Sequence, residues 1–233
     1  MNRQRVESGI QKTWKIADAL GLAEAFGNPN MLSLNTEFRD VILSPTSTYI
    51  DVYLKGMNLS YYNILLEDYS YLQFSMEREG YVRYAYYPNP FISGQSADTA
   101  AFLKLKELVD NSFISHEQYL NLLDSKKTLN GKPMLRYENA PDQRTRFFHP
   151  CSHFHIGFHS DNRWPLKRTL TPYAFSMLVF KQYYGENWRS FGDDDDEDVS
   201  NIFERALIEE KRNCSVVSDS LFEEIEERAF FFC

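Results

Sequence analysis

Hydrophobic positions recur with a helical period at the beginning of the chain. Between residues 3 and 26, apolar side chains return every three or four positions, starting with Val6 and Ile10. This spacing places one apolar stripe along an amphipathic helix. Gly27 and Pro29 follow, and both residues disfavour continuation of a helix. The pattern therefore predicts an N-terminal helix over 3–26.

The next part of the chain is rich in aromatic and branched residues, separated by short turn segments. The expected strands are 48–55, 61–68, 69–77 and 79–87. Their separation is that of hairpins, which favours an antiparallel meander. Pro88 follows the last strand and ends it, because proline cannot donate to a strand ladder.

Helical and strand patterns then follow one another without regular alternation. Helices are expected over 99–111, 116–126, 172–184, about 199–212 and about 219–229, and strands over 133–139 and within 149–161. Thr171 and Pro172 form a typical helix start, a cap followed by proline at the first position. We therefore expect one α+β domain over 1–233, with a mostly antiparallel sheet of about six strands. The sheet core would span about 48–160, with inserted helices, and a helical part would span about 171–233.

Composition narrows the function classes without naming one. The chain has 233 residues, 43% of them hydrophobic, and a formal net charge of −8, which argues against a generally basic surface for nucleic acid. The polar N-terminus predicts no secretory signal, and no apolar run approaches transmembrane length. Three scattered cysteines without a CxxC pair indicate reduced thiols in the cytoplasm. The acidic segment 192–198 predicts a solvated loop.

Four of the five histidines lie within the segment HPCSHFHIGFHSD, residues 149–161. Alternation along a strand places His153 and His155 on one face, where two imidazoles can share a metal ion. His149 and His159 have the same parity and are further candidate ligands, as are Cys151 and Asp161, and Glu138 is the first carboxylate candidate from the neighbouring strand. This hypothesis requires a divalent metal, zinc or manganese.

A second interpretation of the same segment requires no metal. His153 and His155 would serve as general base and general acid, with Glu138 orienting an imidazole. Residues 126–168 carry nine positive and three negative side chains, a net +6 in an acidic protein. Such a groove would bind phosphate. The cations proposed for this role are Arg136, Arg163, Lys167 and Arg168. A third interpretation is that the histidines line a half-buried sheet face with no catalytic role.

Three stretches occur together in a pattern that resembles a known family. They are VRYAYYPNPF at 82–91, LRYEN at 135–139 with HPCSHFHIG at 149–157, and RWPLKRTLTPYAF at 163–175. The set resembles a bacterial and phage-borne family known only as a domain of unknown function, whose members have about this length. The resemblance lends no catalytic residues, and it implies a gene context near mobile elements and defence loci.

A second likeness covers only residues 135–157. An Arg-Tyr-acid motif, a loop and a His-x-His strand look like the small toxins of TumE-like toxin–antitoxin pairs, which are suspected of acting on RNA. That likeness implies functional roles for Arg136, Glu138, His153 and His155.

Two hypotheses about function result. The first is a cytoplasmic nuclease or phosphodiesterase-like protein of a bacterial defence or toxin–antitoxin type system, with RNA or DNA as substrate and no membrane partner. The alternative is a non-catalytic interaction subunit of a defence complex, or a homo-oligomer, that docks through the apolar C-terminal end, residues 229–233.

Overall fold

A single antiparallel sheet forms the centre of the molecule. The computed structural model describes residues 1–91, 96–124, 132–158, 161–193 and 201–230. In these residues the strands of the main sheet lie side by side in chain order, and each neighbouring pair is antiparallel. They are β1 (Ala23–Phe26), β2 (Ile64–Leu66), β3 (Tyr71–Arg78), β4 (Tyr81–Tyr87), β5 (Leu135–Asn139), β6 (Ser152–Ile156) and β7 (Trp164–Pro165). The expected α+β architecture with a mostly antiparallel sheet is confirmed.

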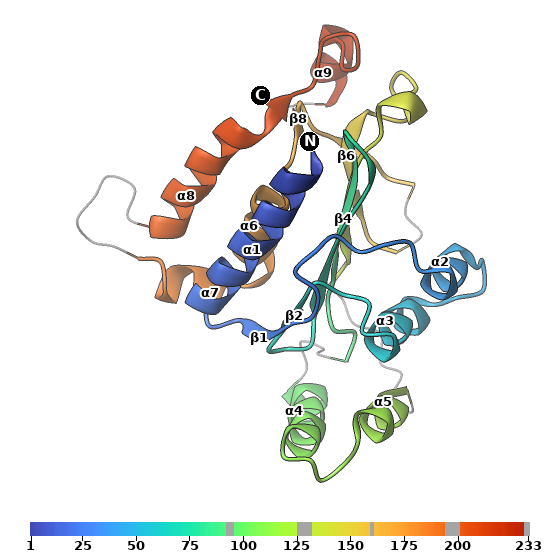
Figure 1. The fold of residues 1–233 in the computed structure, drawn as a ribbon, viewed down its shortest axis with the longest axis vertical. Coiled ribbons are helices and arrows are strands. Elements are labelled where there is room, and N and C mark those ends of the chain that lie inside the picture. The colour runs from blue at the N-terminus through green and yellow to red at the C-terminus, as the bar shows by residue number, and fades with distance from the viewer. Residues whose placement is uncertain (92–95, 125–131, 159–160, 194–200, 231–233) are drawn as a thin grey trace.

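One face of the sheet packs against the N-terminal helix and the helical C-terminal part. Figure 1 shows this group on one side of the sheet. It comprises α1 (Arg3–Ala19), α6 (Pro172–Tyr183), α7 (Gly185–Ser190) and α8 (Ile202–Glu210). Phe74, Tyr84 and Tyr137 point from three adjacent strands into this core, where Phe74 and Tyr84 meet Phe175 of α6 and Tyr137 packs on Tyr84. Burial of these large aromatic side chains supplies most of the cohesion of this layer.

The opposite face carries a second, smaller core. Its helices are α2 (Thr36–Leu43) and α3 (Tyr49–Asn58), and the β4–β5 connection adds α4 (Ser96–Asp110) and α5 (His116–Asp124) at one end of the sheet. Tyr53 of α3 stacks on Tyr71 of β3, and Tyr71 stacks on Tyr87 of β4. This core covers only part of the face, and the uncovered part lies over β4, β5 and β6.

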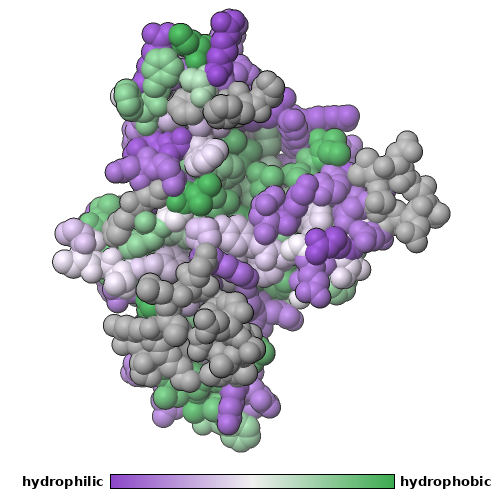
Figure 2. Space-filling view, turned by 180° about the vertical axis from the view of Figure 1, so that it is seen from behind, coloured by the Kyte–Doolittle hydropathy of each residue, from purple (hydrophilic) through white to green (hydrophobic). Residues whose placement is uncertain are grey.

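Short elements complete the described chain. They are the 3-10 turns η1 (Pro141–Gln143) and η2 (Lys211–Asn213), the two-stranded ribbon of β8 (Arg168–Thr169) and β9 (Ser215–Val216), and the helix α9 (Glu224–Phe230). Seen from behind, apolar residues gather in the upper half of the surface among hydrophilic ones (Figure 2). Among the described residues, no helix is both long and apolar enough to span a membrane.

The strand expected over 48–55 is wrong, because this segment forms α3. Thr48 accepts a hydrogen bond from the backbone of Asp51, and the Asp51 side chain accepts one from the backbone of Thr48. This capping box satisfies backbone donors that a helix otherwise leaves free. The helix then buries Val52, Tyr53 and Met57 against the second core. Packing and capping thus outweigh the strand preference of the β-branched and aromatic residues.

The helix expected over 3–26 is too long, and the sheet begins before the expected boundary at residue 48. Helix α1 ends at Ala19, and Gly21 follows with a φ of +65°. Gly21 N donates to Asp18 O and Leu22 N donates to Ala17 O, the hydrogen bonds of a Schellman motif. The chain can therefore turn and enter the sheet as β1.

The remaining boundaries follow the expectations closely, except where the chain is not described. Thr171 accepts from Ala174 N and Pro172 begins α6, which confirms the expected helix start. The closing helices α8 and α9 are shorter than expected. Most of the acidic segment 192–198, His159 and the last three residues of the apolar end lie outside the described residues.

A candidate metal and phosphate site on the sheet

The uncovered part of the sheet presents a grid of polar residues, set by the strand register. Arg83, Glu138 and His153 lie opposite one another across β4, β5 and β6. In the next row of the same face, Arg136 stands between Ala85 and His155. Successive side chains alternate between faces, so these residues point away from the aromatic core and toward the side of α2. The structure thus brings together Arg136, Glu138, His153 and His155, as expected.

The two histidines of β6 meet through their outer ring nitrogens. His153 Nε2 lies 3.0 Å from His155 Nε2, and His153 Nδ1 lies 2.7 Å from the carbonyl oxygen of Pro150. A carbonyl oxygen only accepts, so His153 Nδ1 carries the hydrogen, and the Nε2 lone pair of neutral His153 accepts from the Nε2–H of His155. His153 is 0% exposed and His155 is 4% exposed. The two imidazoles therefore form a buried pair, in which His155 lines the pocket and His153 lies behind it.

Glu138 completes a compact group of three ligands. One ligand atom from each of Glu138, His153 and His155 lies within 4.8 Å of the other two. Glu138 Oε1 accepts from Arg83 Nε at 2.9 Å and lies 3.0 Å from Arg136 Nε. Burial raises the pKa of Glu138, but the two guanidiniums more than offset this effect and hold the pKa below its usual value. The carboxyl group is therefore ionised at neutral pH, as a metal ligand must be.

The pKa values of the neighbouring imidazoles are lowered. Burial, followed by the effect of His155, lowers the pKa of His153 to about 4. Burial, together with the charge of Arg163, lowers the pKa of His149. Both rings are therefore neutral near pH 7, and a neutral imidazole is the form that binds a metal.

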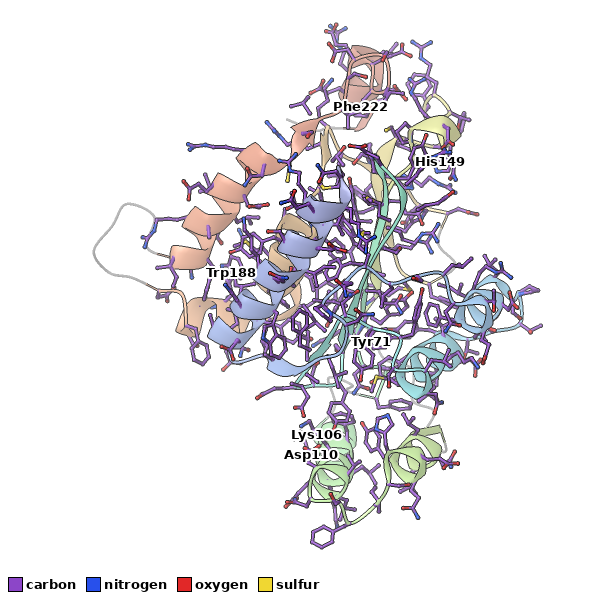
Figure 3. All side chains as sticks on the ribbon, in the orientation of Figure 1. Tyr71, Lys106, Asp110, His149, Trp188 and Phe222 are labelled. Carbon is purple, nitrogen blue, oxygen red and sulfur yellow. The ribbon has the colours of Figure 1, made fainter. Side chains whose placement is uncertain are left out.

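His149 and Arg163 extend the site beyond the strand grid. The rings of His149 and His153 are 5.0 Å apart and nearly perpendicular. Figure 3 shows His149 on the side of the sheet away from α1 and Trp188. Among the described residues, His149 Nε2 and Arg163 Nε are buried without a hydrogen-bond partner. Buried polar atoms without partners are rare, and two in one place indicate a ligand position.

A pocket of about 730 Å³ opens over this group. Its polar half is lined by Arg83, Arg136, Glu138, His149, His155 and Arg163. Its other half is lined by apolar and aromatic residues from α2, from the loop before it and from the strands: Leu32, Leu34, Phe38, Ile42, Leu43, Tyr61 and Tyr87. A pocket of this volume with a few converging polar groups is typical of a small-molecule or active site.

The structure places two of the expected phosphate-binding residues elsewhere. Lys167 Nζ lies 3.1 Å from Asp219 and 3.5 Å from Glu227, and Arg168 donates to the backbone carbonyls of Lys211 and Cys214. These cations secure the C-terminal segment and do not line the pocket of the histidines. Sequence proximity misplaced them, because the chain turns away from the grid after β7.

The other sequence candidates do not join the grid. Cys151 lies before β6 and packs with Val217 and Phe222, and burial raises the pKa of its thiol to about 11. A protonated thiol is a poor nucleophile and a poor metal ligand, so the arrangement does not favour a Cys-His pair. His159 lies outside the described residues.

Arg83 is a residue of the candidate site that sequence reasoning missed. It comes from β4, more than fifty positions before Glu138, yet it donates directly to that carboxylate. A single cation in the otherwise aromatic and apolar stretch 81–87 is a detectable signal, because such a residue needs an anionic partner or a ligand. The apolar residues of α2 that line the pocket could not be found in this way, because that segment has no distinctive motif.

Comparison with known protein families identifies the chain. A family model described as an uncharacterized conserved protein (DUF2290) matches residues 23–219. The chain belongs to this family. The match includes every residue of the DUF2290 chain that lines the polar half of the pocket. Neither the curated proteins nor the solved structures include a match to the chain, so the likeness of residues 135–157 to TumE-like toxins has no support from them.

Proposed function

We propose that the pocket is the active site of a metal-dependent phosphodiesterase or nuclease-like enzyme. Glu138, His153 and His155 would bind one divalent cation, and Arg136 and Arg163 would bind the phosphate. The observation that carries the proposal is the convergence of the three ligand atoms within 4.8 Å beside unpaired guanidinium and imidazole nitrogens. Two imidazoles and one carboxylate are a known donor set of catalytic zinc, and zinc therefore suits the group better than manganese.

The burial of His153 favours a metal over metal-free acid–base catalysis. A general acid and a general base must both reach the reacting atoms. His153 is fully buried and does not line the pocket, whereas His155 does. Of the pair expected from the sequence, His155 alone therefore faces a substrate, and that pair would be incomplete. The second imidazole at the pocket is that of His149.

One contact of a proposed ligand has the form that is common in known metal sites. Metal-binding histidines commonly donate their other ring nitrogen to a carbonyl or carboxylate, which fixes the tautomer and the ring orientation. The bond from His153 Nδ1 to Pro150 has this form. Two nitrogens bound to a tetrahedral zinc lie roughly 3.3 Å apart. The 3.0 Å between the Nε2 atoms is close to that separation.

The charges around the site suit an anionic substrate. Four arginines line the pocket, Arg39, Arg83, Arg136 and Arg163, against two carboxylates, the exposed Glu77 and the buried Glu138. Guanidinium groups bind phosphate oxygens with two hydrogen bonds at once, which fixes the orientation of the phosphate. A bound divalent cation would polarise the phosphoryl oxygen and activate water. His153 and Glu138 would hold that cation in place, while the arginines offset the charge of the phosphate.

Metal content and hydrolysis together test the proposal. We expect about one equivalent of zinc in the purified protein and a loss of that metal in the His153→Ala, His155→Ala double variant. Hydrolysis of bis(p-nitrophenyl) phosphate, labelled RNA and single-stranded DNA should fall with it by about a thousandfold or more. His116→Ala is the matched control, because His116 is exposed on α5. Unchanged hydrolysis in the double variant would overturn the proposal.

The biological setting belongs to the same proposal. Two buried free thiols, Cys151 and Cys214, are consistent with the reducing cytoplasm as the compartment. A place in a bacterial defence or toxin–antitoxin type system stays a prediction, as does docking to a protein partner.

A further inference from the structure

The pocket has an apolar and aromatic lining beside its charged residues. Phe38 and Tyr61 have ring centroids 5.0 Å apart, and Phe38 meets Tyr87 edge-on at 6.0 Å. Leu34 and Leu43 lie at the rim, each 71% exposed. Leucine side chains this exposed beside an aromatic cluster leave an apolar surface in water.

Ala85 brings the two halves within reach of one ligand. Gln73, Ala85, Arg136 and His155 lie opposite one another on the adjacent strands β3 to β6. Ala85 has the smallest side chain of the four. Burial raises the pKa of Tyr61, and the positive charge of Arg83 partly counteracts this effect. Tyr61 lines the same pocket as Arg83 and Arg136. A molecule that joins a phosphate to a flat apolar group would touch both halves.

We propose that the substrate is a nucleoside phosphate ester of about one nucleotide, whose base lies against the wall of Leu34, Phe38 and Tyr61. The proposal rests on the phosphodiesterase function proposed above and names its substrate class. The phosphate would lie between Arg136, Arg163 and His155, as that function requires. The volume of about 730 Å³ falls within the range of small-molecule pockets. It can take a mononucleotide or the end of a single strand.

The aromatic character of the wall favours a base over an alkyl chain. Bases stack on tyrosine and phenylalanine without strong sequence preference, because every base has a π-face. Tyr61 is held in place by a hydrogen bond from its hydroxyl to Ser33 O, which presents the ring at the pocket. A pre-ordered ring loses little entropy when a base stacks on it. A phosphate with an alkyl chain would use the same anion site, and it is the rival ligand that the test must separate.

Binding measurements on the metal-loaded protein test this inference without requiring turnover. The probes are AMP, the ribose monophosphate that lacks the base, inorganic phosphate and octyl phosphate, each titrated by calorimetry. We expect AMP to bind about tenfold tighter than the ribose monophosphate, the range of one stacked base. Equal affinity of these two, or tighter binding of octyl phosphate than of AMP, would overturn the inference.

Variants assign the effect to the wall. Leu34→Ser combined with Tyr61→Ser should remove most of the tenfold preference for AMP and leave the affinity for the ribose monophosphate unchanged. Leu103→Ser is the matched control, because Leu103 is an exposed leucine on α4 outside the pocket. A thermal melt of each variant shows whether it is folded, and Leu34→Ser alone replaces the double variant if that one is not.

The inference and the proposed function can fail separately. If the protein hydrolyses bis(p-nitrophenyl) phosphate but binds AMP no better than the ribose monophosphate, the function stands and the nucleotide assignment falls. If AMP is preferred through Leu34 and Tyr61 but no diester is hydrolysed with any metal, the pocket is a nucleotide-binding site and the proposed hydrolysis is wrong.

Discussion

His153 and Glu138 lie directly opposite each other on β6 and β5, and this register brings two of the proposed metal ligands together. Side chains of directly opposite residues lie within a few ångströms of each other on the same face, and one ligand atom of each of these two lies within 4.8 Å of the other. His155 enters the group from the next row through its contact with His153. The site is therefore built on rigid strands, which hold ligand positions more precisely than loops do.

Removal of the Glu138 charge should weaken metal binding. We expect Glu138→Gln to lower zinc affinity by at least about tenfold, because one of three protein ligands is lost and the arginines beside it lose their anion. The change keeps the size of the side chain, so the fold should persist. Competition with a zinc chelator measures the affinity.

Glu79→Gln is the control for that measurement, since Glu79 is exposed at the turn between β3 and β4. Equal zinc affinity of Glu138→Gln and the control would show that the carboxylate is not a ligand.

Arg163 and Lys167 should behave differently, although both were expected to bind phosphate. Arg163 lines the pocket with a buried Nε that has no partner among the described residues, whereas Lys167 is paired with Asp219 and Glu227. We expect Arg163→Ala to raise KM about tenfold with little change in zinc content, since a charge-assisted hydrogen bond to phosphate is lost. Lys167→Ala should leave KM unchanged. Steady-state hydrolysis of a diester substrate gives both values, and an equal rise in KM for the two variants would contradict the placement.

The contrast between these cations shows how far the sequence leads to the site. Alternation along one strand is a local property, so His153 and His155 could be assigned to one face from the sequence. Arg136 and Glu138 could be assigned to one face of the neighbouring strand in the same way, because that strand also alternates. Arg83 is separated from Glu138 by the long β4–β5 connection. Which residue of β5 lies opposite Arg83 depends on the β4–β5 register, and the sequence does not specify that register by itself.

Cys151 should be dispensable for activity. Its thiol packs with Val217 and Phe222, and burial raises its pKa to about 11, so little thiolate exists near neutral pH. We expect Cys151→Ala to keep diester hydrolysis within about twofold of the unmodified protein. It should lower the free energy of unfolding by about 1 kcal/mol through the small cavity that it leaves. Hydrolysis rates and urea unfolding of the variant check both values, and a large loss of activity with an intact fold would point to a Cys-His nucleophile.

The fold could be predicted at the level of its class and most of its elements. Strong periodic segments such as Tyr71–Arg78 and capped helices such as Pro172–Tyr183 carry their own signals. The prediction of a strand over 48–55 was wrong because the aromatic and β-branched residues of this segment fit either a strand or a buried helix face. The segment becomes a helix because it packs into the second core and because the Thr48–Asp51 capping box stabilises its first turn.

Glu226 should make the stability of the protein depend on pH. It is 0% exposed, accepts from Phe147 N at 3.1 Å and from Arg144 at 2.7 Å, and ties α9 to the loop that carries His149. Burial raises the pKa of Glu226. This effect is more than offset by hydrogen bonds from the backbones of Glu223 and Phe147 and from the Arg144 guanidinium, so the pKa is below the usual 4.5. A carboxylate with a lowered pKa stabilises the folded state above that usual value, and this contribution disappears as the pH falls through the lowered pKa.

We expect Glu226→Gln to lower the free energy of unfolding near neutral pH by about 3 kcal/mol, because Arg144 loses its buried partner. The difference from the unmodified protein should shrink as the pH falls below the usual 4.5 and through the lowered pKa, where the native carboxylate also becomes protonated. Urea unfolding at a series of pH values measures this convergence. Glu224→Gln is the control, since Glu224 lies exposed on the same helix and pairs only with Arg228 in the described structure. A difference that stays constant down to low pH would mean that Glu226 stabilises α9 by packing and not by its charge.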